Sequence, residues 1–133
     1  MTKTLVSHVG IAVRDLESAI KSYSVLSGLQ NPAIENIESE KVEVAMFSSV
    51  GGRIELLAAT SEDSPIARFI NNRGEGLHHI CIYVDDIELK LSELKKAGIK
   101  VIDETYRLGA GGKKIAFVHP QNLNGVLIEL EER

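Results

Sequence analysis

Two stretches of the chain, 5–13 and 77–84, alternate apolar and polar residues with the two-residue period of a β-strand. Immediately after each stretch, apolar residues recur three and four positions apart, which predicts helices over 15–27 and 86–97. An aspartate stands at the start of each helix, where its side chain can accept hydrogen bonds from the first backbone N–H groups. Each half of the chain therefore opens with a predicted strand followed by a predicted helix.

Further strands are predicted after each helix. In the first half they cover 41–48 and 53–59, joined around Gly51–Gly52, while 31–39 is predicted to be a loop. In the second half they cover 99–102, 114–119 and 125–130. A short helix over 62–72 is predicted to connect the two halves.

The two halves repeat the same residues at matching places. The sequence SHVGIAVRD at 7–15 is echoed by HHICIYVDD at 78–86, so that His79 stands 71 residues after His8 (79 − 8). Glu129 follows Glu55 by a similar interval of 74 residues (129 − 55). A repeat of this kind indicates a tandem duplication in which each half supplies one histidine and one glutamate on predicted strands.

The duplication predicts an α+β fold, in which two tandem βαβββ modules form a curled mixed sheet around a metal site with the helices outside. We expect a single domain over 1–133. Within it, the first module is expected at 1–60, a linker helix at 61–75 and the second module at 76–133.

Strand alternation predicts which side chains face the concave side of the curled sheet. Apolar residues such as Val9, Ile11 and Val13 are expected to pack under the helices, which leaves the two histidines on the opposite face. The same alternation predicts that the side chains of Glu43, Glu55 and Glu129 share that concave face. His78, one residue out of register, is expected to point to the helix side or the sheet edge and to bind no metal.

Two imidazoles and two carboxylates, from His8, Glu55, His79 and Glu129, predict a site for one divalent metal ion. This mixed nitrogen and oxygen set suits Co, Ni, Mn, Fe or Zn better than Ca, which prefers oxygen ligands alone. A single histidine on a strand would indicate only an ordinary residue with a hydrogen-bonded ring. The recurrence of the pair in both halves favours the metal.

The composition excludes several classes of partner and compartment. With 133 residues, a net charge of −4 and no run of five like charges, the chain has no feature that favours binding to nucleic acid or an anionic membrane. It has no apolar run near the ~20 residues of a membrane span, and its first residues do not resemble a signal peptide. A single cysteine, Cys81, allows no intrachain disulfide, so we expect a cytoplasmic protein.

Four motifs carry a resemblance to a known family: HVGIAV at 8–13, GLHHICIYVDDI at 76–87, LGAGGKKIAFVHP at 108–120 and NGVLIELEE at 124–132. Together with the repeated His and Glu, they resemble the vicinal oxygen chelate superfamily and, within it, the methylmalonyl-CoA epimerases. The resemblance implies paired βαβββ modules, a divalent ion held by His8, Glu55, His79 and Glu129, and an acyl-CoA substrate.

An epimerase must remove the α-proton of methylmalonyl-CoA on one face and return a proton on the other, which requires two bases. The resemblance implies that Glu43 and Glu129 are these bases, with Glu129 also a metal ligand. A bound divalent ion would stabilise the negative charge that develops when the proton leaves. The alternative for Glu43 is a solvent-exposed strand carboxylate.

The segment 108–114 has two interpretations. Its glycines, Gly109, Gly111 and Gly112, allow backbone amides to approach a ligand closely, and Lys113 and Lys114 carry charge suited to the diphosphate of CoA. The same residues also suit a flexible hairpin with solvated lysines, and the family resemblance favours a wall of the acyl-CoA pocket. His119 is a further candidate for contact with the substrate, or else caps a turn.

Other activities of the same family are alternatives. Lactoylglutathione lyases of the glyoxalase I type, which act on a glutathione hemithioacetal, use a similar ligand set, and only Glu43 and the glycine-rich loop favour the epimerase. A non-catalytic protein that binds a small molecule is the third alternative. A ring-cleaving dioxygenase is disfavoured, because such enzymes use two histidines and one carboxylate. The sequence leaves open which acyl-CoA is the substrate, ethylmalonyl-CoA included, and whether the chain forms a homodimer.

Overall fold

The computed structural model describes residues 3–133 and has an α+β fold with a mixed sheet, as predicted. The first half contains β1 (Val6–Ala12), α1 (Leu16–Ser27), β2 (Ala33–Ile37), β3 (Val42–Ser49), β4 (Gly52–Ala59) and α2 (Pro65–Arg73). The second half contains β5 (Gly76–Val84), α3 (Ile87–Lys96), β6 (Arg107–Leu108), β7 (Lys114–Val118) and β8 (Ile128–Glu132). Within residues 3–133, no helix combines the length and apolar character needed to cross a bilayer.

The chain divides into two compact units. The first unit comprises Val9–His78, and the second comprises His79–Arg133 together with the N-terminal residues through His8. The division falls within β1 and within β5, so both strands contribute residues to each unit. The module limits expected at 1–60 and 76–133 stay a prediction.

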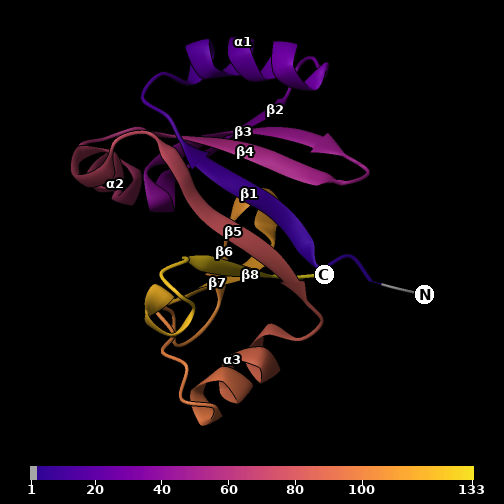
Figure 1. Cartoon of the computed structure of the whole chain (residues 1–133), viewed down its shortest axis with the longest axis vertical. Helices are drawn as coiled ribbons and strands as arrows, with labels where there is room; N and C mark the ends of the chain where they lie inside the picture. Colours follow the sequence, from indigo (N-terminus) through magenta and orange to yellow (C-terminus); the bar gives the residue numbers. More distant parts are fainter. Residues whose placement is uncertain (1–2) are drawn as a thin grey trace. The chain divides into compact units, whose positions relative to one another are not determined.

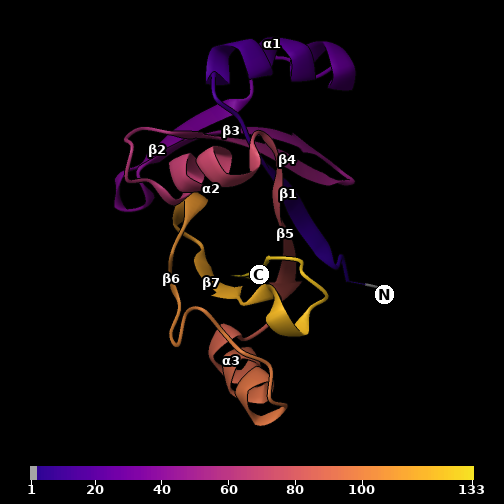
Figure 2. The same ribbon diagram turned by 60° about the vertical axis from the view of Figure 1, so that its left-hand side comes forward.

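In the first unit the strands follow the order β2-β3-β4-β1, and apolar side chains cover both faces of the sheet. Figures 1 and 2 show α1 on one face of this sheet and α2 on the other. The core beneath α1 includes Phe47 and Leu56, whereas the core beside α2 includes Val44 and Leu57. Both faces of these strands are therefore buried against helices.

In the second unit the order is β1-β5-β8-β7-β6, and the apolar core cluster lies on one face of the sheet. Helix α3 covers that face, where Ile87 and Leu91 pack against Val84 and Leu130 (Figure 1). β5 and β8 run parallel and pair Cys81 with Glu129, and β7 and β8 run antiparallel. Because side chains alternate, the opposite face of this sheet receives polar side chains from β5 and β8.

Both helices that follow a site-bearing strand begin at the predicted aspartates. The carboxylate of Asp15 accepts a hydrogen bond from the backbone N–H of Ser18, and that of Asp86 accepts one from Leu89. These caps satisfy backbone donors that a helix leaves without internal partners. They fix where β1 and β5 end and the chain turns away.

Two predicted elements are wrong. The segment 31–39 is not a loop throughout, because β2 forms there by pairing with β3, as between Ile37 and Val42. The predicted strand at 99–102 is reduced to a single bridge between Val101 and Val118. The short strand before β7 is instead Arg107–Leu108. β2 is an edge strand with mostly exposed side chains, so it lacks the alternation that predicts a strand. The extent of pairing near Val101 depends on β7 and not on local sequence.

The core under α3 allows a direct test with two leucines of one helix. Leu91 is 2% exposed, whereas Leu89 is 56% exposed. We expect Leu91→Ala to lower the free energy of unfolding by about 2–5 kcal/mol, because it removes a packed side chain and leaves a cavity. Leu89→Ala should change it by less than about 0.5 kcal/mol. Urea unfolding followed by circular dichroism measures both, and equal losses would contradict the assigned core.

Candidate metal centre

Three predicted ligands meet in the second unit. His8 comes from β1, His79 from β5 and Glu129 from β8, each from the face of its strand opposite α3. The Nε2 atoms of the two histidines lie 3.1 Å apart. The Oε1 atom of Glu129 lies 3.0 Å from each of them. One carboxylate oxygen and two ring nitrogens therefore converge on a single point.

The spacing of these three atoms fits a bound metal ion. Neighbouring ligands of an octahedral ion with bonds of ~2.1 Å lie about 3.0 Å apart, whereas those of a tetrahedral ion lie about 3.4 Å apart. The observed separations of 3.0–3.1 Å match the octahedral value. The residues thus fit a divalent ion that accepts nitrogen and oxygen ligands together.

The three ligand side chains are withdrawn from solvent. His8 is 3% exposed, His79 6% and Glu129 7%. Burial alone would raise the pKa of Glu129, but hydrogen bonds from His79 and His8 outweigh it and lower the pKa to about 2. Glu129 is therefore an anion at neutral pH and carries the negative charge that a cation site requires.

The rings are held by their neighbours. The rings of His8 and His79 meet edge to face, with centroids 5.2 Å apart and planes at 85°. The ring of Phe117, whose β7 position pairs with Glu129, packs against His79 in the same manner at 5.6 Å. Such contacts restrict ring rotation and keep both Nε2 atoms aimed at the same point.

A second set of buried polar groups lies behind His8. The hydroxyl of Ser7 is 3.0 Å from His8 Nδ1 and donates a hydrogen bond of 3.1 Å to Glu131 Oε1. The thiol of Cys81 lies 4.0 Å from the same oxygen. No local sequence pattern indicates these three residues, although Glu131 stands two positions after Glu129 and therefore shares its face of β8.

Glu55, the predicted fourth ligand, belongs to the first unit. It is 4% exposed, and its Oε2 atom accepts two hydrogen bonds from the guanidinium of Arg53, at 3.2 and 3.1 Å. The guanidinium places positive charge beside this buried carboxylate. Its role as a ligand stays a prediction.

Glu43 does not share a face with Glu55, so this part of the prediction is wrong. The antiparallel register pairs Glu43 with Ala58 and Glu55 with Met46, and paired residues lie on the same face. Ala58 belongs to the core beneath α1, whereas Met46 packs against the core beside α2. The catalytic role assigned to Glu43 is a separate question and stays a prediction.

The glycine-rich segment forms the turn between β6 and β7. A Cβ atom at Gly109 would lie 2.8 Å from the side chain of Ile115, and Gly111 and Gly112 have φ values of 70° and 71°. The hairpin itself therefore requires these glycines, whatever ligand they contact. Lys113 is exposed, whereas Lys114 lies over the ring of Tyr106 and 3.7 Å from Glu132.

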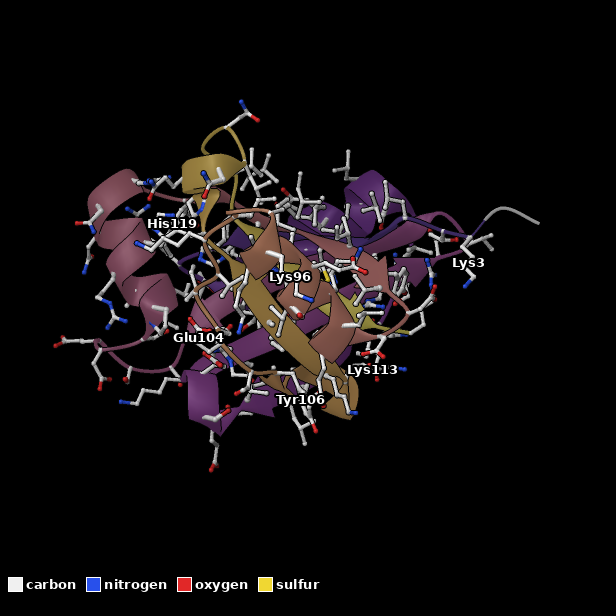
Figure 3. The ribbon with its side chains drawn as sticks, turned by 90° about the horizontal axis from the view of Figure 1, so that it is seen from below. Lys3, Lys96, Glu104, Tyr106, Lys113 and His119 are labelled. Atoms are coloured by element: carbon white, nitrogen blue, oxygen red, sulfur yellow. The ribbon has the colours of Figure 1, made fainter. Side chains whose placement is uncertain are left out.

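The other two histidines have structural partners. His119 Nδ1 accepts a hydrogen bond from the backbone N–H of Gln121 and so caps the short 3₁₀ turn Pro120–Asn122. His78 packs edge to face on Phe69 of α2. Figure 3 shows Lys113 and His119 well apart, so a ligand that contacts both must be long. Contact of either residue with a substrate stays a prediction.

Comparison with known proteins identifies the family. A family model described as the Glyoxalase/Bleomycin resistance protein/Dioxygenase superfamily matches residues 7–117. The chain belongs to this superfamily. The match includes His8 and His79 but ends before Glu129. It confirms the resemblance found in the sequence motifs.

Members of the superfamily with known and unknown activities are similar to this chain. The mitochondrial methylmalonyl-CoA epimerase of Homo sapiens is 40% identical over 127 residues, which cover 95% of this chain and 72% of that protein. A hypothetical protein from Bacillus halodurans has a structure with a TM-score of 0.93 at 39% identity, covering 98% of this chain and 96% of the other. The structure of a methylmalonyl-CoA epimerase in complex with methylmalonyl-CoA and NH4+ has a TM-score of 0.88 at 32% identity, covering 98% of this chain and 95% of the other.

The geometry of the candidate metal centre predicts that substitution of two adjacent histidines affects metal affinity differently. We expect the protein to bind about one divalent ion per chain and His79→Ala to weaken binding by more than ~100-fold, because a direct ligand is lost. His78→Ala is the matched control and should bind as the unchanged protein does, since its ring contacts Phe69. Titration calorimetry with Co²⁺ or Zn²⁺ measures both. Equal affinities for the two variants would contradict the site.

Proposed function

We propose that this protein is a metal-dependent epimerase that interconverts (2R)- and (2S)-methylmalonyl-CoA. The observation that carries the proposal is the convergence of His8, His79 and Glu129 at 3.0–3.1 Å in a buried site. Similarity to methylmalonyl-CoA epimerases over 95% or more of the chain supports the choice of substrate. The ion would be held by these three residues, with Glu55 as the proposed fourth ligand.

When bound, the divalent ion would supply positive charge next to the oxygens of the substrate and so favour loss of the α-proton. His8 and His79 would contribute neutral nitrogen donors on rigid strands and so add no negative charge to the site. Glu129 is held as an anion by its two histidine partners, so it can accept a proton without first losing one. Burial of all three side chains limits competing exchange with water.

Inversion requires a second base on the other side of the α-carbon. Glu43 is the proposed residue, because the family resemblance implies it. The β3–β4 register counts against the simplest version of this role, since it places Glu43 and Glu55 on different faces. A substitution at Glu43 is therefore the variant that decides the assignment.

Glu43→Gln preserves the size of the side chain and removes its ability to accept a proton. If Glu43 is the second base, turnover should fall by ~10²–10⁴-fold, the usual contribution of a positioned general base, with metal affinity nearly unchanged. Because Glu129 survives, the variant should still exchange the α-proton of one epimer with deuterated solvent. Epimerisation at the rate of the unchanged protein would exclude Glu43 as a base.

The proposed activity is tested by incubating the metal-loaded protein with each epimer of methylmalonyl-CoA in deuterium oxide. We expect both epimers to reach the same mixture and to incorporate deuterium at the α-carbon, because two bases act on opposite faces. The hemithioacetal of glutathione and methylglyoxal is incubated in parallel. Turnover of the hemithioacetal alone would establish the lactoylglutathione lyase alternative, and binding without turnover of either would establish a binding protein.

A further inference from the structure

Ser7 and Glu131 lie against the side of the His8 ring that faces away from the converging ligands. His8 points Nε2 at His79 and Glu129, so Nδ1 is the ring atom on the opposite side. Ser7 Oγ is 3.0 Å from this Nδ1, and Glu131 Oε1 is 3.8 Å from it. Ser7 is 1% exposed and Glu131 is 4% exposed, so both groups are shielded from competition with water.

The proton that His8 Nε2 donates to Glu129 must leave when a metal ion binds there, and the remaining protons can be assigned from the number that each group carries. A serine hydroxyl has one proton and can donate it only once, and here it donates to the carboxylate of Glu131. Its oxygen then presents a lone pair to His8 Nδ1, which must supply the proton of that hydrogen bond. A neutral imidazole protonated on Nδ1 carries its lone pair on Nε2. That lone pair faces the point where the three ligand atoms converge.

We propose that Ser7 and Glu131 are positioning residues that hold His8 in its metal-binding form. Glu131 fixes the direction of the Ser7 hydroxyl, and the hydroxyl fixes the proton on Nδ1. Without the carboxylate, the hydroxyl is able to turn and donate to Nδ1, which moves the ring proton to Nε2 and blocks metal binding there. The inference rests on the metal site of the proposed function and is independent of the substrate.

A different use of the same residues is a second metal site. Ligand atoms of His8, Cys81 and Glu131, one from each residue, lie within 4.8 Å of one another. The position of Ser7 Oγ argues against it, because the hydroxyl already bridges Nδ1 and the carboxylate. A second ion would also require His8 to lose both ring protons in order to bind through both nitrogens.

Zn²⁺ affinity, measured by competition with a chromophoric chelator, tests the proposal together with NMR of the zinc-loaded, ¹⁵N-labelled protein. We expect the unchanged protein to show a slowly exchanging Nδ1–H proton for His8. Glu131→Gln, which preserves size, should weaken Zn²⁺ binding by ~10–100-fold, the usual effect of removing a group behind a metal ligand. The Nδ1–H signal should exchange rapidly or disappear in this variant. Ser7→Ala should weaken Zn²⁺ binding and alter the Nδ1–H signal in the same way, and it tests the proposal if Glu131→Gln folds poorly.

Two control variants distinguish positioning from general destabilisation and from a second site. Glu104→Gln removes an exposed carboxylate of the same unit, and Cys81→Ala removes the thiol; both should retain one Zn²⁺ at unchanged affinity. An unchanged affinity and an unchanged Nδ1–H signal in both Glu131→Gln and Ser7→Ala would overturn the proposal. Two Zn²⁺ per chain, falling to one in Cys81→Ala, would also overturn it. If Zn²⁺ binding follows these expectations but no acyl-CoA is epimerised, the proposed function fails and the positioning role stands.

Discussion

The site depends on keeping two imidazoles and a carboxylate within 3.0–3.1 Å of one another in a buried environment. Burying an anion is costly unless hydrogen bonds or a cation compensate for lost hydration. The histidines provide that compensation for Glu129, as its lowered pKa shows. Because each side chain comes from a different strand, backbone pairing in the sheet, rather than any local loop, holds the three groups together.

The two units differ in how their sheets use side-chain alternation, and this difference decides what the sequence could predict. In the second unit one face is apolar and packs on α3, so a residue that points away from Ile82 or Leu130 must be on the site face. Alternation was therefore enough to place His79 and Glu129 together. In the first unit both faces are apolar, one under α1 and the other beside α2. Alternation alone then cannot show on which of the two faces a polar residue lies. The prediction that Glu43 and Glu55 share a face was wrong for this reason.

The repeat predicted the fold class, the order of most elements and the three side chains that converge, because a repeat is visible in residue types and spacing alone. The sequence did not reveal β2, because this edge strand is mostly exposed and lacks an alternating apolar pattern. It did not reveal the reduction of the strand at 99–102 either, because that depends on pairing with β7. Nor did it indicate Ser7 and Glu131. Their importance arises only when β1 and β8 bring residues 7 and 131 within hydrogen-bonding distance, an arrangement that no local pattern encodes.

The position of one strand, β8, therefore determines the placement of more site side chains than any single residue does. Its site face carries Glu129, which contacts both histidines, and Glu131, which stands behind His8 through Ser7. A slip of one residue in its pairing would turn both carboxylates into the apolar core under α3. Glu132 opposes such a slip, because its Oε1 atom accepts a hydrogen bond from the backbone N–H of Ile87 at the start of α3. The contact that fixes the helix to the end of β8 thus also fixes the geometry of the metal ligands on the other face.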